Sequence, residues 1–427
     1  MNTEFDIKIE RLGLKGDGIG TLEDGRRVFV SGVLSGEKVH VRFVSEKPEG
    51  AMAKLVRILE PSLQRIEAPC LYFGQCGGCA LQHMNVQSYR DFKTERVKQA
   101  LLGAGIKREV DELFVSPSYR RRRAVLSAKC TEKGSVQIGF NERASHTLVE
   151  IDSCFVLRPA LMAVVPYLRL FLPRLMTQGE CYDVAIAESE GLVEMLIIVL
   201  GKQEKKLRKE DKAILYELSV ASAVARLSWQ ASERKAAEVL FKQEDYVVRL
   251  GSFSVQPPPG GFLQATEEGQ EALTSFAVAG LSRKSRVADL YAGCGTFTFS
   301  LLDQGHRVDS FEGNKAALDS LTQAGKGDSR VQSYQRDLVK EPLTFQELKI
   351  YDAVVIDPPR VGALRQMEEI GRSSVSKVIS ISCNPDSFAR DAKILVQNGF
   401  ILKRLKVVDQ FLWSPHVEVA GLFVRRR

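Results

Sequence analysis

The C-terminal part of the chain alternates short apolar runs with stretches of helical pattern. Four such runs stand between residues 256 and 427, at residues 287–290, 307–311, 353–356 and 378–381. Runs of this length, separated by helical stretches, predict buried strands joined by crossover helices. We therefore expect residues 256–427 to form an α/β domain with a mostly parallel, doubly wound sheet. The proline- and glycine-rich residues 256–261 predict the connection into this domain.

The first 60 residues have the pattern of short strands. Residues 39–43 alternate strictly between apolar and polar side chains, residues 28–30 have strand character, and Glu23-Asp24-Gly25-Arg26 is typical of a hairpin turn. Many short strands in a small region predict a β-barrel of the oligonucleotide-binding type over residues 1–60. A β-rich module without a binding role has the same pattern. Pro61 marks the expected boundary.

Residues 61–255 are expected to form a central α+β domain. Residues 89–101 have helical spacing, and Gly103 ends the pattern. Further along, Arg120-Arg121-Arg122-Arg123 precedes an apolar run. On a strand, these arginines would alternate between the two faces. Two readings stay open for them, namely contact with RNA and ion pairs within the protein.

Composition narrows the class of protein without choosing a function. The 427 residues include 60 Lys and Arg against 53 Asp and Glu, a net charge of +7 that permits a polyanionic partner. The longest apolar stretch is far below the roughly 20 residues of a membrane span, and the acidic N-terminus lacks a signal region. We therefore expect a cytoplasmic protein without membrane contact. In that compartment the eight cysteines are not expected to form disulfides.

A glycine loop follows the first apolar run of the C-terminal domain, in Asp289-Leu290-Tyr291-Ala292-Gly293-Cys294-Gly295. Gly293 and Gly295 let the backbone approach a ligand at a helix N-terminus. Thr298 stands where a dinucleotide fingerprint needs a third glycine. Glu312 closes the next run, where a carboxylate can accept both hydroxyls of a ribose. This series resembles the S-adenosylmethionine site of class I methyltransferases, and the alternative is a Rossmann-like turn without this ligand.

The third apolar run ends in Asp357-Pro358-Pro359-Arg360, at the same predicted edge of the sheet. The two prolines restrict the backbone and remove two hydrogen-bond donors. The motif resembles the fourth motif of class I methyltransferases. Enzymes that methylate amino groups usually carry an aromatic residue where Arg360 stands, which argues against chemistry on an exocyclic amine. Arg360 is suited to hold a phosphate or a base carbonyl.

The fourth apolar run ends at Cys383, and Asn384-Pro385 follows as a turn. A thiol at this edge acts either as a buried packing residue or as a nucleophile. Methylation at C5 of a pyrimidine requires a nucleophile, because addition of a thiolate at C6 activates C5. The adduct then needs a base to remove the C5 proton. Glu418 is the first candidate for that base, and His416 is the second.

Three of the remaining cysteines form the series Cys70-x5-Cys76-x2-Cys79. Cysteines this close together, with glycines between them, indicate a metal site. Cys154 is the expected fourth ligand, in preference to Cys130 and Cys181. Four thiolates suit zinc or an iron–sulfur cluster, and the unusual Cys-x5-Cys spacing favours the cluster.

Together these motifs resemble the RNA uracil-C5 methyltransferases that carry a [4Fe-4S] cluster and a TRAM-type barrel. The resemblance includes the cysteine series, the arginine run after Tyr119, and the glycine loop. It continues through Asp-Pro-Pro-Arg, Ser-Cys-Asn-Pro and His-Val-Glu in the same order. It implies that Cys383 is the nucleophile and Glu418 the proton acceptor. It also implies that six residues line the S-adenosylmethionine pocket: Gln264, Tyr291, Thr296, Glu312, Asp337 and Asp357. The chain departs from the family at Thr296, where asparagine is frequent, and in the segment before His416.

The expected protein is therefore a monomeric enzyme that methylates C5 of a uridine in RNA. The resemblance favours 23S rRNA as its substrate, and the T-loop uridine of tRNA is the alternative. A second alternative is a non-catalytic iron–sulfur protein that binds RNA. The expected domains are an RNA-binding barrel at 1–60, a central domain with the cysteine series at 61–255, and the methyltransferase domain at 256–427.

Overall fold

The computed structural model describes residues 4–143, 145–201, 204–282 and 284–426. The chain forms two compact units, each of which draws on segments far apart in the sequence. The first unit comprises Met1–Arg96, Phe140–Ile151 and Phe411–His416, and the second comprises Val97–Gly139, Asp152–Gln410 and Val417–Arg427. Among the described helices, none combines the length and the apolar character that crossing a membrane requires.

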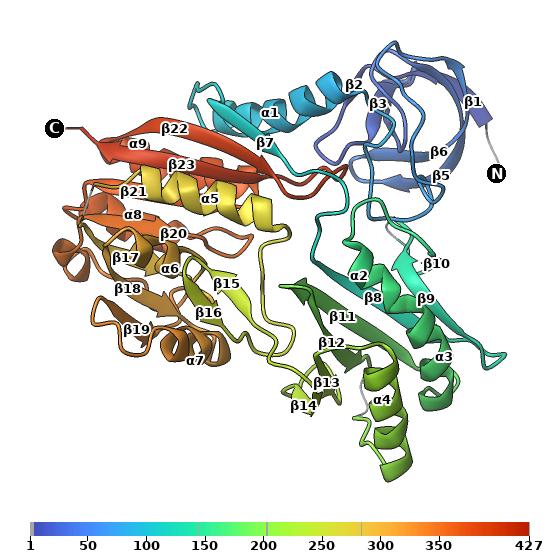
Figure 1. Ribbon diagram of the computed structural model, residues 1–427. Helices are drawn as coiled ribbons and strands as arrows, with labels where there is room; N and C mark the ends of the chain where they lie inside the picture. Colours follow the sequence, from blue (N-terminus) through green and yellow to red (C-terminus); the bar gives the residue numbers. More distant parts are fainter. Residues whose placement is uncertain (1–3, 144, 202–203, 283, 427) are drawn as a thin grey trace. The chain divides into compact units, whose positions relative to one another are not determined.

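The first unit contains a curved sheet of six strands, of which β5 and β6 are the longest (Figure 1). In the order in which they pair, the strands are β1 (Glu4–Lys8), β5 (Lys38–Lys47), β6 (Gly50–Glu60), β4 (Arg27–Val30), β3 (Gly18–Thr21) and β2 (Arg11–Leu12). Val39 and Val41 are fully buried in β5 while their neighbours are not, as strand alternation requires. The predicted hairpin turn lies between β3 and β4, and Gly25 there has a φ of 85°. The expected small domain of short strands is confirmed.

A long loop follows β6 and leads into helix α1 (Val86–Gly103), which ends at the glycine that the sequence predicts. The ends of this loop are held together by an antiparallel bridge between Arg65 and Met84. Arg65 also donates hydrogen bonds to the buried Glu37, at 2.6 and 2.7 Å, which attaches the loop to the sheet of the same unit. The short strand β10 (Leu148–Glu150) belongs to the first unit as well.

The second unit contains a mixed sheet built from central residues. In pairing order, six strands of this sheet are β9 (Val136–Asn141), β8 (Arg123–Cys130), β11 (Cys181–Ser189), β12 (Leu192–Val199), β13 (Arg226–Gln230) and β14 (Glu238–Lys242). The helices in this central part of the sequence are α2 (Pro159–Ala163), α3 (Val165–Leu175) and α4 (Lys209–Ala221). The hairpin of β15 (Val248–Leu250) and β16 (Phe253–Val255) precedes the proline-rich connection.

The C-terminal sheet of the second unit has eight strands (Figure 1). Their order is β19 (Val331–Gln335), β18 (Arg307–Glu312), β17 (Arg286–Leu290), β20 (Ala353–Ile356), β21 (Lys377–Ser382), β23 (Glu418–Arg425), β22 (Phe400–Asp409) and β7 (Glu112–Val115). The first five are parallel, and β23 runs antiparallel to β21 and β22. The four predicted strands and the doubly wound α/β fold are confirmed. The strand β7, which comes from the central part of the sequence, was not predicted.

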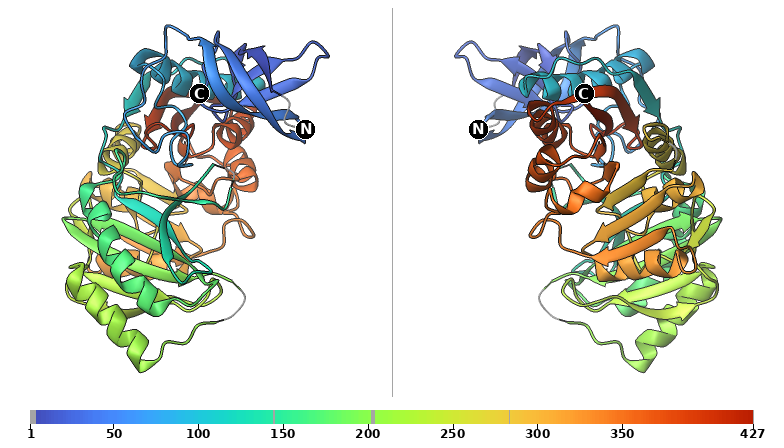
Figure 2. Two further views of the ribbon diagram at one scale, coloured as in Figure 1. Left: turned by 90° about the vertical axis from the view of Figure 1, so that its right-hand side faces the viewer. Right: turned by 90° about the vertical axis from the view of Figure 1, so that its left-hand side faces the viewer.

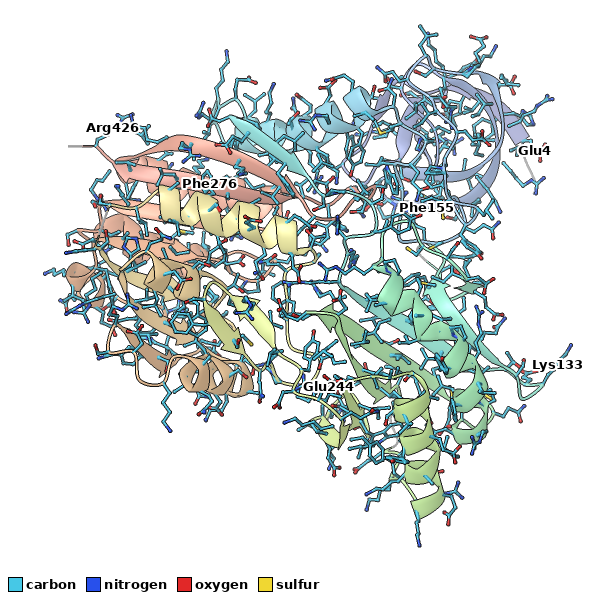
Figure 3. The ribbon with its side chains drawn as sticks, in the orientation of Figure 1. Glu4, Lys133, Phe155, Glu244, Phe276 and Arg426 are labelled. Carbon is cyan, nitrogen blue, oxygen red and sulfur yellow. The ribbon has the colours of Figure 1, made fainter. Side chains whose placement is uncertain are left out.

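Helices cover both faces of this sheet, as the layers in Figures 1 and 2 show. One face packs against α8 (Leu364–Arg372) and α9 (Pro385–Gln397), through side chains that include Val354 and Ile356. The other face packs against α5 (Glu267–Ala279), α6 (Thr296–Asp303) and α7 (Lys315–Ala324), and it includes Val355. Phe276, labelled in Figure 3, is a buried side chain of α5. The short helix η1 (Glu347–Ile350) precedes β20. Because both faces are covered, chemistry is confined to the carboxyl edge of the strands.

Candidate active site

Four candidate residues lie at one edge of the C-terminal sheet because of strand order and direction. Tyr291, Asp357 and Cys383 each follow the last residue of a parallel strand, in β17, β20 and β21, which are neighbours. Glu418 opens β23, which runs in the opposite direction, so its first residue lies at the same edge. The pairing of Ser382 with Val419 places Cys383 and Glu418 beside each other along this edge.

The glycine loop is held by Glu312, which ends β18. The backbone N–H of Gly293 donates to Glu312 Oε2 at 2.8 Å, and the N–H of Asn314 donates to Glu312 Oε1 at 2.7 Å. Gly293 and Gly295 have φ values of 57° and 100°, which favour glycine. A Cβ on Gly295 would lie 2.5 Å from a ring carbon of Phe299, whereas one on Gly293 would meet nothing within 4 Å. The loop therefore packs against α6 below Gly295 and leaves open space at Gly293.

Asp289 lies inside β17 beneath this loop and is completely buried. Thr298 donates to its Oδ2 at 2.6 Å and exchanges a 2.8 Å hydrogen bond with Ser310. Asp289 Oδ1 has no hydrogen-bond partner among the described residues. Burial raises the pKa of Asp289 to about 7, against which the Thr298 hydrogen bond acts. The threonine that replaces the third glycine of a dinucleotide fingerprint thus has a structural reason.

Three further candidates for the same pocket are Tyr291, Thr296 and Asp337. Tyr291 has a positive φ of 62°, and its pKa is raised to about 12, first by burial and then by charges that include Asp337 and Glu312. Thr296 is the first residue of α6 and half-buried. Asp337 is exposed after β19, and its carboxylate pairs with Lys340 at 3.0 Å, which lowers its pKa. Cys294 is a buried core residue of the loop.

A chain of amide side chains joins Asp357 to Glu418. Gln264 Nε2 donates to Asp357 Oδ2 at 3.3 Å. Gln410 Nε2 donates to Gln264 Oε1 at 2.5 Å and to Glu418 Oε1 at 3.2 Å. Burial raises the pKa of Asp357 to about 7. Burial, and then the charge of Asp357, raise the pKa of Glu418 well above its ordinary value, whereas Gln410 and Arg123 lower it.

Cys383 is half-buried beside these carboxyl groups. Its pKa is raised to about 11, first by burial and then by the charges of Glu418 and Asp357, while Arg360 lowers it. With a pKa of about 11 the thiol is mostly protonated at neutral pH, and formation of the reactive thiolate requires added positive charge or a proton acceptor.

The turn after Cys383 is attached to the Asp-Pro-Pro-Arg loop. Asn384 caps α9 by accepting from the N–H of Asp386 at 3.1 Å, and its Nδ2 donates to the carbonyl of Arg360 at 3.2 Å. Ser387 also donates to the Arg360 carbonyl at 3.2 Å. The Asn-Pro signal in the sequence therefore marks a helix cap that joins two motifs, while the Arg360 side chain stays exposed.

For the arginine run, the structure shows contacts within the protein, which is one of the two roles that the sequence leaves open. Contact with RNA stays a prediction. The strand β8 begins only at Arg123, so a strand does not contain the whole run. Arg122 is 1% exposed and acts inside the protein: its Nε donates to the carbonyl of Gln264 at 3.0 Å and its Nη2 donates to Gln270 at 2.8 Å. Arg123 lies against the ring of Phe262, 4.7 Å from its centroid. Arg120 is exposed and pairs with Glu268 at 3.2 Å.

Sequence reasoning missed Gln410 and the inward role of Arg122. Neither residue has a sequence signal, because a glutamine after a strand and one arginine among four are unremarkable. Contacts with Gln264, which is more than a hundred residues from either in the sequence, reveal them. His416, the second candidate base, is exposed, and its ring stands edge-on to Phe411 at 6.1 Å in the first unit.

The cysteine series lies in the loop between β6 and α1. Cys70, Cys76 and Cys79 are partly exposed, and Gly77 packs so closely that a Cβ would lie 2.8 Å from the carbonyl oxygen of Asn141. Cys154 belongs to the second unit. Within the described parts of the chain, no group of three or more His, Cys, Asp or Glu side chains is placed to hold a metal ion. The metal site stays a prediction.

Comparison with known families gives two matches. Residues 258–427 match the family described as tRNA (Uracil-5-)-methyltransferase. Residues 2–56 match the TRAM domain. The first match covers the C-terminal sheet except its strand β7, and the second covers most of the N-terminal strands.

Two curated proteins and one solved structure resemble nearly the whole chain. An uncharacterized RNA methyltransferase of Mesorhizobium japonicum is 37% identical over 100% of this chain and 99% of its own length. The 23S rRNA (uracil(1939)-C(5))-methyltransferase RlmD of Chromohalobacter salexigens is 32% identical over 99% of this chain and 90% of its own. The crystal structure of Pyrococcus abyssi tRNA (uracil-54, C5)-methyltransferase with S-adenosyl-L-homocysteine matches with a TM-score of 0.76. It is 22% identical over 98% of this chain and 99% of that chain, which shows a common fold.

Proposed function

Because this chain belongs to the S-adenosylmethionine-dependent RNA uracil-C5 methyltransferases, we propose that it methylates C5 of a uridine through a covalent Cys383–C6 adduct. The observation that carries this proposal is the place of Glu418. It opens a strand antiparallel to the one that ends before Cys383, so a nucleophile and a base stand at one edge. The charge of Glu418 also raises the pKa of Cys383, as expected for two groups at neighbouring positions of this edge.

The proposed steps use the two groups in succession. The Cys383 thiolate adds to C6 of the uracil, and the electrons of the C5–C6 bond move into the ring carbonyl at C4. C5 would then form its bond to the methyl carbon while the bond between that carbon and the sulfonium sulfur of S-adenosylmethionine breaks, with S-adenosylhomocysteine as the leaving group. The Glu418 carboxylate removes the proton from C5, the C5–C6 double bond reforms, and the C6–sulfur bond breaks to return the thiolate. The target base would have to leave its stack to reach this edge.

Burial raises the pKa of both groups, and the Cys383 thiol, with a pKa of about 11, must lose its proton before it acts. Positive charge at the edge favours the thiolate, and Arg360 already acts in this direction. When bound, S-adenosylmethionine supplies the methyl group and a positive sulfonium charge. We propose that Gln264, Tyr291, Thr296, Glu312, Asp337 and Asp357 hold it. The open space at Gly293 and the anchored carboxylate of Glu312 support this assignment.

We propose 23S rRNA as the substrate class and a cytoplasmic monomer as the active form. Support for rRNA comes from the name of the Chromohalobacter relative, which is 32% identical over nearly the whole chain. In this proposal residues 1–60 bind RNA, residues 61–255 carry the cysteine series, and residues 256–427 perform methyl transfer. The TRAM match supports the first of these roles. The T-loop uridine of tRNA remains the second candidate, named by a structure that shares the fold at 22% identity.

We propose that Cys70, Cys76, Cys79 and Cys154 hold a [4Fe-4S] cluster, with zinc as the alternative metal. The bridge between Arg65 and Met84 and the hydrogen bond from Arg65 to Glu37 fix the ends of the loop between β6 and α1. This supports a site whose backbone is held in place without the metal. Methyl transfer is not a redox reaction, so the cluster would have a structural role. The visible spectrum and the iron and zinc content of anaerobically purified protein test this proposal. Zinc without iron would contradict the cluster.

The proposed function is tested by looking for the loss of one 5-methyluridine when the gene is deleted. In a strain that lacks the gene, mass mapping of rRNA and tRNA should show one 5-methyluridine missing from 23S rRNA. The wild-type gene should restore it, and a gene encoding Cys383→Ala should not. Loss from tRNA would move the proposal to the second substrate. An unchanged set of 5-methyluridines in both RNAs would contradict the proposed function and favour a non-catalytic RNA-binding protein.

A further inference from the structure

Gln410 is buried between the backbone before α5 and the start of β23, with 1% of its surface exposed. Its Oε1 accepts from the backbone N–H of Ala265 at 2.8 Å. It lies 3.5 Å from the N–H of Thr266. A backbone N–H only donates, so the oxygen of the amide must face α5. The amide nitrogen of Gln410 must then face the opposite way, toward Gln264 and Glu418.

Both hydrogens of this nitrogen have acceptors. One goes to Gln264 Oε1 at 2.5 Å, and the other goes to Glu418 Oε1 at 3.2 Å. Because Gln264 accepts through its oxygen, its nitrogen is left to donate to Asp357 Oδ2. The direction of every hydrogen bond from the Ala265 N–H to Asp357 is therefore determined by one backbone donor.

This arrangement distinguishes the two oxygens of Glu418. Oε1 is an acceptor for Gln410, so a proton that the carboxyl group carries or receives belongs on Oε2. We propose that Gln410 is a positioning residue of the methyl-transfer reaction: it fixes Glu418 with Oε2 directed to the C5 proton and keeps Oε1 occupied. The inference rests on the proposed function, because it assigns a task within the step in which Glu418 acts as a base.

Other groups also face Glu418 and share control of its protonation. The charge of Asp357 makes the Glu418 carboxylate less favourable, and Arg123 makes it more favourable. The charge of Glu418 in turn raises the pKa of Cys383. The hydrogen bond from Gln410 acts in the same direction as Arg123. Removing it should leave adduct formation by Cys383 nearly unchanged while slowing removal of the C5 proton. It should also move the pH at which that removal is half-maximal to a higher value.

Two RNA substrates separate these steps. RNA with 5-fluorouridine at the target forms an adduct that cannot lose a C5 proton, so it reports formation alone. Natural RNA reports resolution of the adduct. For Gln410→Met, we expect formation within about twofold of wild type and resolution slowed about tenfold or more. Adduct should accumulate on natural RNA, and the pH profile of resolution should shift to alkaline values. Gln397→Met, on the exposed side of α9, is the matched control.

Gln410→Glu provides a second, nearly isosteric variant. Its carboxylate keeps an acceptor for the Ala265 N–H but offers no donor to Glu418, so resolution should again slow and shift to alkaline pH. A variant that only damages the fold would slow formation and resolution together without the shift. If both variants resolve adducts at the wild-type rate and pH, the role of Gln410 is wrong. If wild-type protein forms no adduct on fluorinated RNA, the proposed function fails instead.

Discussion

Arg122 Nε donates a hydrogen bond to the backbone carbonyl of Gln264 at 3.0 Å, across 142 residues of sequence. The backbone N–H of Arg122 also donates to the carbonyl of Ala265 at 2.9 Å. A buried guanidinium thus holds the segment from which Gln264 reaches Asp357. Glu267, which pairs with Arg122 at 3.4 Å and with Arg158 at 2.6 Å, supplies the opposite charge.

Arg122→Met should destabilise the second unit strongly. The change leaves the carbonyl of Gln264 without its donor, whereas Glu267 is 42% exposed and keeps its ion pair with Arg158. Leaving a buried acceptor unsatisfied costs about 1 to 3 kcal/mol. Urea denaturation measures the loss. Arg120→Met is the control, since Arg120 is exposed and its ion pair should contribute at most about 1 kcal/mol. Equal stability of the two variants would contradict the inward role of Arg122.

Glu418→Gln should trap the covalent RNA adduct. Cys383 still adds to C6, but the amide cannot take the C5 proton, so turnover should fall by a factor of about 10² to 10⁴. A denaturing gel with radiolabelled natural RNA detects the trapped complex, and Cys383→Ala should show none. Turnover by Glu418→Gln at the wild-type rate would mean that another residue is the base.

Asp289→Asn should flatten the pH dependence of stability. Because burial raises the pKa of Asp289 from 3.8 to about 7, only the unfolded chain releases this proton between those values. The contribution of the protonated group is complete below the unfolded pKa and is lost as pH rises through about 7. The loss is on the order of 4 kcal/mol, since one pKa unit corresponds to about 1.4 kcal/mol.

Asparagine keeps a carbonyl acceptor for Thr298 but has no proton to lose. The difference in free energy of unfolding between Asp289→Asn and wild type, measured at about pH 5 and about pH 8, should favour the variant more at the higher pH. Asp319→Asn, at an exposed residue of α7, is the control. A difference that is the same at both pH values would show that Asp289 stays ionised.

The alkylation rate of Cys383 should report its raised pKa. In the protein alone, carboxymethylation of this residue, followed by peptide mass, should rise with pH toward an apparent pKa of about 11. Arg360→Met should move this value still higher, because the charge of Arg360 lowers it. Arg365→Met, at an exposed residue of α8, is the matched control. Rapid alkylation at neutral pH would contradict a protonated resting thiol.

The residues at the sheet edge were predictable because each follows a strand that the apolar pattern reveals. Parallel strands bring their carboxyl ends to one side, so Glu312, Asp357 and Cys383 were expected near one another without coordinates. The place of Glu418 depends on β23 running antiparallel beside β21, and neither the pattern nor the spacing shows that pairing. The resemblance to the methyltransferase motifs predicted the role of Glu418. The strand register explains why Glu418 lies beside Cys383.

The chain by itself determined the α/β domain, the short-stranded N-terminal domain and the candidates at strand ends, since these follow from local periodicity and turn residues. Only the tertiary structure decided which arginine of the run turns inward and which amide side chain contacts Glu418. Arg122 and Gln410 each meet Gln264 across more than 140 residues. Buried polar groups need hydrogen-bond partners, and this requirement determines which distant residues meet. The local sequence pattern does not show which residues supply those partners.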